Sequence, residues 1–134
     1  MADLYEQIPQ FARAHRLARI PEGVSGRDDG DEYEARQHDE ADGIKDAHVI
    51  TSHDPTTGKH RPILDIDLPA ALIPSSTPGH YHLYIDKPME WDRYEDLLDA
   101  LSAVGIIEEG YASASCDREY TSVRLPWIKK SKEN

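Results

Sequence analysis

The chain has 134 residues, a formal net charge of −11 at pH 7 and a hydrophobic content of 38%. This length predicts a single domain, residues 1–134, with a modest core. The acidic charge argues against direct nucleic-acid binding and against an anionic membrane surface. The single cysteine, Cys116, excludes an internal disulfide and a thiolate zinc site, as expected for a cytoplasmic protein.

The first part of the chain divides into a helical pattern and an acidic, glycine-rich stretch. Within residues 1–20, apolar side chains and one histidine recur at helical spacing, at Leu4, Ile8, Phe11 and His15. This pattern predicts an N-terminal helix that starts or is kinked at Pro9. Residues 21–46 carry few aliphatic side chains and many acids, which is typical of a flexible, solvated loop.

Residues 47–128 are expected to form an α+β core. The segments HVITSHD and HRPILDIDL flank the turn-rich PTTGK and predict a β-hairpin. The next segment, AALIPSSTPG, contains two prolines and a glycine and predicts a loop, after which HYHLYID predicts the third strand. GYASASCD and TSVRLPWI predict two further strands, and residues 129–134 predict a polar tail.

The clearest predicted element is a helix over roughly residues 90–104. Its apolar stripe consists of Trp91, Tyr94, Leu97, Leu98, Leu101 and Val104, and its polar face consists of Asp92, Glu95, Asp96 and Asp99. The order of the elements predicts an α+β fold of the two-layer sandwich type. One layer would be a four- or five-stranded, mainly antiparallel sheet, covered by this long amphipathic helix together with the N-terminal helix.

Strand periodicity places several polar side chains on one face of the predicted sheet. Residues two apart in a strand point the same way, so the apolar residues of the strands, among them Tyr81, Leu83 and Ile85, are expected under the helix. The opposite face would gather Asp65, Asp67, His82, Asp86 and Arg124. These five residues form the candidate site of the sequence.

The chemistry of this site depends on whether it is buried. Two carboxylates at positions i and i+2 of a strand, here Asp65 and Asp67, lie about 7 Å apart. In water their repulsion is small and the pair needs no function. On a half-buried sheet they would need a cation, and Mg²⁺ or Mn²⁺ prefers such oxygen ligands. The same residues therefore allow either an exposed pair without function or a metal site.

The segments ILDID (63–67) and SSTPGHYHLYID (75–86) resemble two motifs of archaeo-eukaryotic primases and primase-polymerases. In that family an hhDhD strand precedes a small-residue turn and a strand with a histidine. The resemblance implies two-metal nucleotidyl transfer, in which Asp65 and Asp67 hold the cations and His82 contacts a nucleotide phosphate. The third acid would be Asp86 or Asp117. The match covers about 24 of the 134 residues, and the gap between its motifs is shorter than is usual in the family.

The run HLYID…W…Y…LL…RLPW…KK, over residues 82–130, is also similar to small actinobacterial-phage proteins of unassigned function. This similarity implies an acidic phage protein in the host cytosol. Two functions therefore follow from the sequence. The first is a non-catalytic interaction protein that binds a basic host protein through the acidic loop and the acidic helix face. The alternative is a metal-dependent nucleotide or phosphodiester site, in which His82 and Arg124 act on a phosphoryl group.

Overall fold

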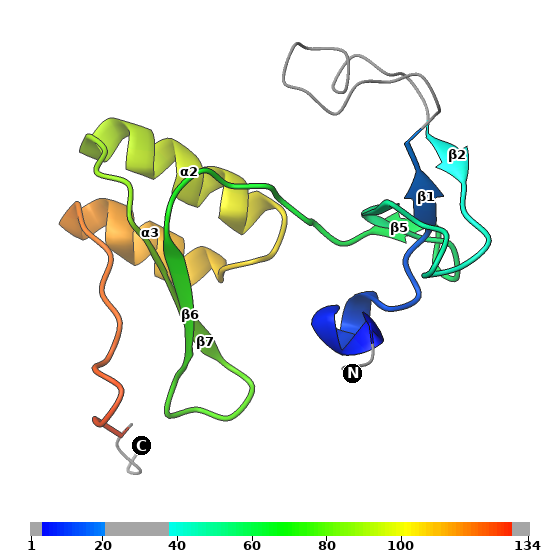
Figure 1. The fold of residues 1–134 in the computed structure, drawn as a ribbon. Helices are drawn as coiled ribbons and strands as arrows, with labels where there is room; N and C mark the ends of the chain where they lie inside the picture. The colour runs from blue at the N-terminus through cyan, green and yellow to red at the C-terminus, as the bar shows by residue number, and fades with distance from the viewer. Residues whose placement is uncertain (1–3, 21–37, 130–134) are drawn as a thin grey trace. The chain divides into compact units, whose positions relative to one another are not determined.

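The computed structural model describes residues 4–20 and 38–129, and the chain divides into two compact units, Met1–Asp65 and Ile66–Asn134 (Figure 1). Helices and small antiparallel sheets occur together, so the fold is α+β, as the sequence predicted. Residues 21–37 of the expected acidic loop and 130–134 of the expected tail lie outside the described residues. No helix among the described residues has both the length and the apolar composition needed to cross a membrane.

Unit 1 begins with two short 3-10 helices, η1 (Leu4–Gln7) and η2 (Gln10–Ala12), and then β1 (Leu17–Arg19). The predicted helix over residues 1–20 is therefore wrong. Pro9 has an extended ψ of 141°, which separates the two turns, and its ring leaves no N–H to continue a helical ladder. The apolar spacing is that of a helix, but the backbone cannot follow it through the proline.

A three-stranded sheet follows, with β1 between β2 (Asp39–Glu40) and β3 (Val49–Ile50). Both neighbours are antiparallel to β1, and Ala18 faces Glu40 on one side and Val49 on the other. Ala18 is completely buried, which its small side chain allows at the middle of a narrow sheet. β3 lies inside the first strand that the sequence predicted.

The predicted hairpin around PTTGK is present but short. β4 (His53–Asp54) pairs with β5 (Lys59–His60), and Gly58 adopts a φ of +75° in the turn, a conformation that glycine accepts without strain. The second strand was expected to run to Leu68, but the chain from 61 to 69 is irregular. Pro62 has no N–H to donate to a ladder, so it ends the pairing soon after β5.

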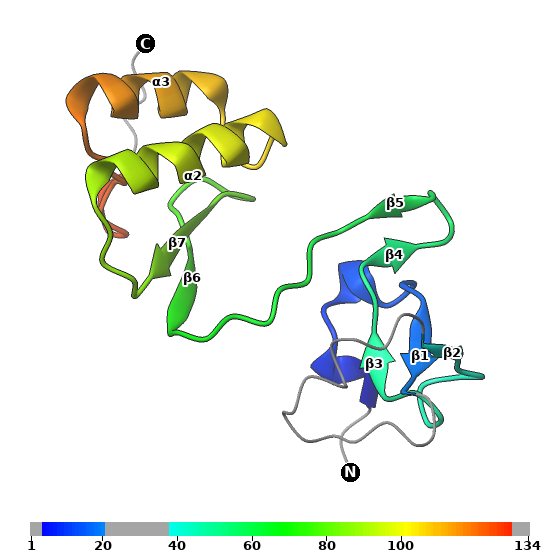
Figure 2. The same ribbon diagram turned by 90° about the horizontal axis from the view of Figure 1, so that it is seen from above.

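Unit 2 begins with a second hairpin, β6 (Ala70–Pro74) and β7 (Tyr81–Ile85), seen beside the helices in Figure 2. β7 was predicted, whereas β6 lies in the segment that was expected to be a loop. β6 forms because it pairs with β7 at five positions, from the Ala70–Ile85 pair to the Pro74–Tyr81 pair. Proline is tolerated at the end of an edge strand, so Pro74 ends β6 without preventing it.

Two helices complete unit 2, and they lie side by side in Figures 1 and 2. α2 (Trp91–Ala103) confirms the predicted amphipathic helix, with Leu98 buried and Gly105 at φ +82° after its end. α3 (Glu109–Arg118) replaces a predicted strand. Its buried Ala112 and Ser115 are three residues apart, so small side chains let the two helices approach closely.

The described strands form three separate sheets of three, two and two strands rather than the single predicted four- or five-stranded sheet. The predicted last strand, TSVRLPWI, is also irregular. Side-chain contacts hold the start of this segment, because Tyr94 Oη lies 2.6 Å from Thr121 Oγ1 and Tyr111 Oη donates to the carbonyl of Ser122 at 3.0 Å. Contacts with helix side chains take the place of the expected strand ladder.

The predicted packing of the apolar strand face under the helix is not found in the β6–β7 hairpin. Leu83 and its apolar neighbours on β7 are exposed, with 57% of Tyr81, 60% of Leu83 and 45% of Ile85 accessible. His82, on the other face of the strand, is half-buried opposite Ile73. The alternation along β7 was predicted, but its apolar face is exposed, and on the other face His82 is half-buried while Tyr84 is 48% exposed.

Candidate functional site

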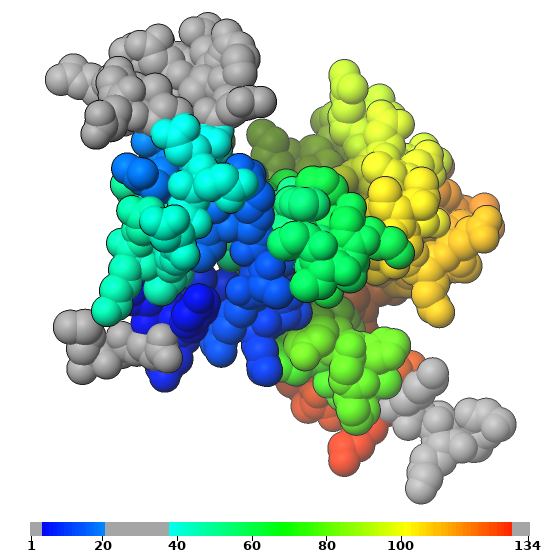
Figure 3. All heavy atoms as spheres, turned by 90° about the vertical axis from the view of Figure 1, so that its right-hand side faces the viewer, coloured from blue at the N-terminus to red at the C-terminus, as the bar shows by residue number. Residues whose placement is uncertain are grey.

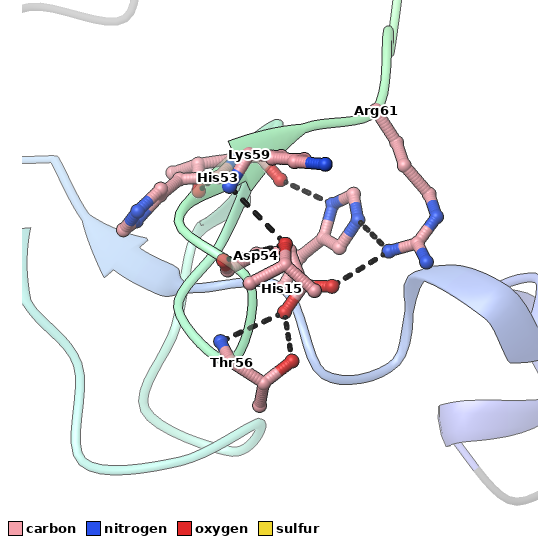
Figure 4. A network of polar contacts seen from close by, with 8 residues as sticks. His15, His53, Asp54, Thr56, Lys59 and Arg61 are labelled. Carbon is pink, nitrogen blue, oxygen red and sulfur yellow. Dashed lines mark hydrogen bonds and ion pairs between the residues drawn. The ribbon is translucent and has the colours of Figure 1, made fainter.

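Unit 1 has a buried polar network where a hydrophobic core would be expected. His15 follows η2 and is only 3% exposed, and Asp54 at the end of β4 is only 4% exposed. Arg61, just after β5, lies between them (Figure 4). Its Nη1 donates to Asp54 Oδ2 at 2.8 Å and points at His15 Nε2 at 3.4 Å.

Asp54 also organises the turn between β4 and β5. Its Oδ1 accepts hydrogen bonds from the Thr56 amide at 3.0 Å and the Thr56 hydroxyl at 2.7 Å. These bonds from Thr56, together with the Arg61 guanidinium, lower the pKa of Asp54 from 3.8 to about 2. A carboxylate so fully engaged is a very weak base at neutral pH, so Asp54 is suited to structure rather than to proton transfer.

The hydrogen bonds of His15 fix its tautomer. Nδ1 lies 2.8 Å from the carbonyl oxygen of Thr51, which can only accept, so Nδ1 carries the proton. Nε2 is then the acceptor that faces Arg61. The hydroxyl of Thr51 donates to the carbonyl of Arg16 at 2.8 Å and continues the network. With both ring nitrogens engaged inside the unit, His15 connects the turn after η2 to the segment between β3 and β4 and to the segment after β5.

The predicted site residues lie in different surroundings from those expected. Asp65 and Asp67 are exposed in the irregular stretch before β6, so strand alternation does not place them on a common face. Arg124 is exposed in the irregular segment after α3. His82 is the one member of the set that is half-buried.

The hairpin register does bring Asp86 to the end of the hairpin where β6 begins. The amide of Asp86 donates to the carbonyl of Pro69 at 2.9 Å, and Asp67 precedes Pro69 by two residues. His82 lies four residues from Asp86, which is about 13 Å along a strand. In residues 4–20 and 38–129, no three His, Cys, Asp or Glu side chains are grouped to hold a metal ion. The predicted site is thus not gathered into one metal-binding cluster.

A different group of acids converges between α2 and α3. Burial and the carboxylate of Glu95, which accepts a hydrogen bond from the thiol, raise the pKa of Cys116, and the charges of Glu95, Asp99 and Asp117 add to the shift. A shallow depression of about 320 Å³ lies beside this thiol. Its lining is Asp99, Ser102, Ala103, Glu109, Ala112, Ser113 and Cys116. We refer to these lining residues as the helix-pair depression.

The sequence analysis missed the helix-pair depression because it assigned GYASASCD to a strand. In a strand, Ala112, Cys116 and Glu109 would not share one side. In a helix, Glu109, Ala112, Ser113 and Cys116 recur three or four residues apart and form one stripe along α3. The helical spacing of these residues was the available signal.

The raised pKa of Cys116 predicts slow alkylation. At mildly alkaline pH, less of the thiol is ionised than in a free cysteine, and the thiolate is the reactive form. Iodoacetamide should therefore modify the folded protein slowly, and Glu95→Gln should accelerate the reaction roughly severalfold and lower the pH midpoint of the rate. Asp96→Asn, an exposed α2 acid that does not contribute to the shift, is the matched control. Equal rates for both variants would contradict the assigned role of Glu95.

No protein-family model matches the sequence, and the comparisons with curated proteins and with solved structures gave no match either.

Proposed function

We propose that this protein is a non-catalytic interaction protein that binds a basic protein partner through the carboxylates of α2 and α3. The observation that carries the proposal is the helix-pair depression, whose lining includes Asp99 from α2 and Glu109 from α3. Negative charges placed close together on neighbouring elements repel one another. A positively charged partner would relieve this repulsion, which makes the helix pair a better binding surface than scattered surface acids.

The helix-pair depression has the chemistry to receive a lysine or arginine side chain. Ala103 and Ala112 offer an apolar lining for the methylene stem of the incoming side chain. Lysine and arginine readily bury this stem while the charged head stays outside. Asp99 and Glu109 bring one carboxylate from each helix for the charged head. A basic segment of a partner protein could therefore be anchored by one side chain between the helices and by further charges along α2.

The expected partner is a basic host protein, if the similarity to actinobacterial-phage proteins reflects the origin of the chain. The proposal then places the protein in the host cytosol. Complementary charges increase the rate of association and select against acidic partners. The exposed acids of α2, Asp92, Asp96 and Asp99, would contribute to this steering.

A fluorescently labelled, lysine- and arginine-rich peptide tests the proposal. We expect Asp99→Asn combined with Glu109→Gln to weaken its binding roughly three- to tenfold, because two charge contacts are lost. Fluorescence anisotropy would measure the affinity, and the affinity of the wild-type protein should fall as salt is raised.

The matched control is Asp65→Asn combined with Asp67→Asn. It also removes two negative charges, but at positions distant in sequence from the depression. This control should bind the peptide nearly as tightly as the wild-type protein. Equal weakening in both double variants would show that only net charge attracts the peptide, and the proposed site would be wrong.

One observation supports the metal-dependent nucleotide site as a second candidate. The Asp86 to Pro69 hydrogen bond places Asp86 at the hairpin end that Asp67 precedes. Asp67 and Asp86 would offer carboxylate oxygens to Mg²⁺ or Mn²⁺, and His82 and Arg124 would contact a phosphate. Millimolar Mn²⁺ should then raise the melting temperature, and the Asp65→Asn, Asp67→Asn variant should lose that shift. An unchanged melt in Mn²⁺ would rule out this candidate.

A further inference from the structure

We propose that unit 2 binds a second copy of this chain through the apolar face of its β6–β7 hairpin. Residues that pair across an antiparallel ladder point to the same face, so the register defines the members of this face. They are Ala70, Leu72 and Pro74 on β6 and Tyr81, Leu83 and Ile85 on β7. We call this set the apolar hairpin face.

The large side chains of the apolar hairpin face are open to solvent. The accessible fractions are 61% for Leu72, 57% for Tyr81, 60% for Leu83 and 45% for Ile85. On the opposite face, Ile73 and His82 are half-buried. The opposite face is covered only at this pair, since Tyr84 is 48% exposed, and the face of Leu72 and Leu83 is the more open of the two.

A two-stranded hairpin with one open apolar face needs a further layer. Such hairpins are marginally stable alone in water, and sheets gain stability when an apolar face packs on another element. Two hairpins can pack face to face, with their strands roughly aligned, to form a small sandwich. The second layer that was expected within the chain would then come from the hairpin of another copy.

The composition of the face favours a second copy over a foreign partner. The apolar hairpin face contains no charged residue, although the chain as a whole has a net charge of −11. Two copies repel one another through acidic surfaces such as α2, so an uncharged face is where they can meet. Interfaces between identical chains are also more apolar than those of transient complexes with other proteins.

The irregular segment after α3 lies next to the hairpin turn and would add to this surface. The hydroxyl of Ser76, in the hairpin turn, donates to the carbonyl of Ile128 at 3.3 Å, and Figure 3 shows the red segment against the yellow-green hairpin. Trp127 is 72% exposed and Ile128 is 44% exposed. Both therefore present apolar surface next to the hairpin turn.

The available area is sufficient for a specific dimer. At roughly 100 Å² for each large exposed side chain, each copy offers about 600 Å² of apolar surface. The six side chains counted are Leu72, Tyr81, Leu83, Ile85, Trp127 and Ile128. Two copies would then bury about 1,200 Å², the lower end of the range for specific interfaces. In a two-fold arrangement the same residues meet in both copies. Leu72 and Leu83, which pair in the middle of the ladder, would lie at the centre.

Sedimentation equilibrium of the full chain over a range of concentrations tests this proposal. The wild-type protein should be a dimer, and Leu72→Glu should raise the dimer dissociation constant at least about a hundredfold, because each copy would bury an unpaired charge. Ala71→Glu is the matched control: Ala71 neighbours Leu72, is also exposed, and pairs with Tyr84 on the opposite face. This control should remain dimeric.

The wild-type measurement decides the question even if Leu72→Glu does not fold. A wild-type protein that stays monomeric at every concentration would overturn the proposal, whether the face is covered by unit 1 of the same chain or by a different protein. Equal dissociation of the Leu72→Glu and Ala71→Glu variants would overturn it as well. The Asp99→Asn, Glu109→Gln variant should bind the peptide roughly three- to tenfold more weakly and remain dimeric, so failure of the proposed function and failure of this dimer are distinguishable.

Discussion

Replacement of Leu98 by alanine is expected to lower the free energy of unfolding of unit 2 by about 2–5 kcal/mol. Leu98 is 3% exposed in the middle of α2, and the only other buried hydrophobic residue among the described residues of unit 2 is Ala112. Truncation removes the largest buried side chain among the described residues of unit 2 and leaves a cavity that the surrounding structure cannot easily close. A unit with so few buried residues has little other packing to compensate.

Urea unfolding followed by tryptophan fluorescence measures this effect selectively. Both tryptophans, Trp91 and Trp127, belong to unit 2. Val104→Ala is the control, because Val104 follows α2 but is 71% exposed, and its truncation should change the stability by less than about 0.5 kcal/mol. A small effect at both positions would mean that Leu98 is not buried in unit 2 in solution.

The stability of unit 1 is expected to depend on the ionisation of Asp54. The pKa of its carboxyl group is 3.8 ordinarily and about 2 in the folded protein. Because the folded-state value is the lower one, the carboxylate stabilises the unit above pH 4. That contribution is lost as the pH falls from about 4 to about 2, and unfolding takes up about one proton in this range. Asp54→Asn should remove this proton uptake and should destabilise the unit at neutral pH.

Amide hydrogen exchange detects this change within unit 1. The amides of Thr56 and Gly58 bond to the side chain and the carbonyl of Asp54, at 3.0 Å and 2.8 Å. They should lose protection between pH 4 and pH 2 in the wild-type protein, after correction for the intrinsic exchange rate, and should be poorly protected in Asp54→Asn at every pH. Asp46→Asn is a control from the same unit, since Asp46 is bonded elsewhere. Unchanged protection in Asp54→Asn would contradict the role of the network.

The elements that could be predicted from the sequence have local causes. The apolar stripe of α2 and the glycine after it indicate a helix of nearly the observed length. The turn residues PTTGK indicate a hairpin, because Gly58 supplies the positive φ that the turn requires. The alternation in HYHLYID likewise indicates β7. In each case the residues that define the element are neighbours in the sequence.

The elements that were predicted wrongly depend on distant partners. AALIP forms a strand because β7 pairs with it, although its composition resembles a loop. GYASASCD forms a helix because Ala112 and Ser115 allow close packing on α2. In the N-terminal segment, Phe11 fits the helical pattern but is 68% exposed, while His15 is buried. Composition and spacing do not reveal which of these positions finds a partner.

The polar sites likewise divide into residues that are close in the sequence and residues that are brought together only by the fold. The sequence identified the acids and histidines of residues 65–86 because they are close in the chain, but it could not determine whether they converge. The network of His15, Asp54 and Arg61 joins residues up to 46 positions apart. The acids around Cys116 come from two helices. Neither group has a signature within a short window, since each is assembled by packing.

The sequence by itself determined the α+β class, the acidic charge, the amphipathic α2 and the strand of HYHLYID, because periodicity and turn chemistry act over a few residues. The tertiary structure alone decided that the strands in the described part of the chain form three small sheets and that α3 is a helix. It also decided that Asp54 is buried beside Arg61 and that the apolar hairpin face is open. Pairing and burial depend on residues far away in the chain, and the free energy gained by packing overrides local preference.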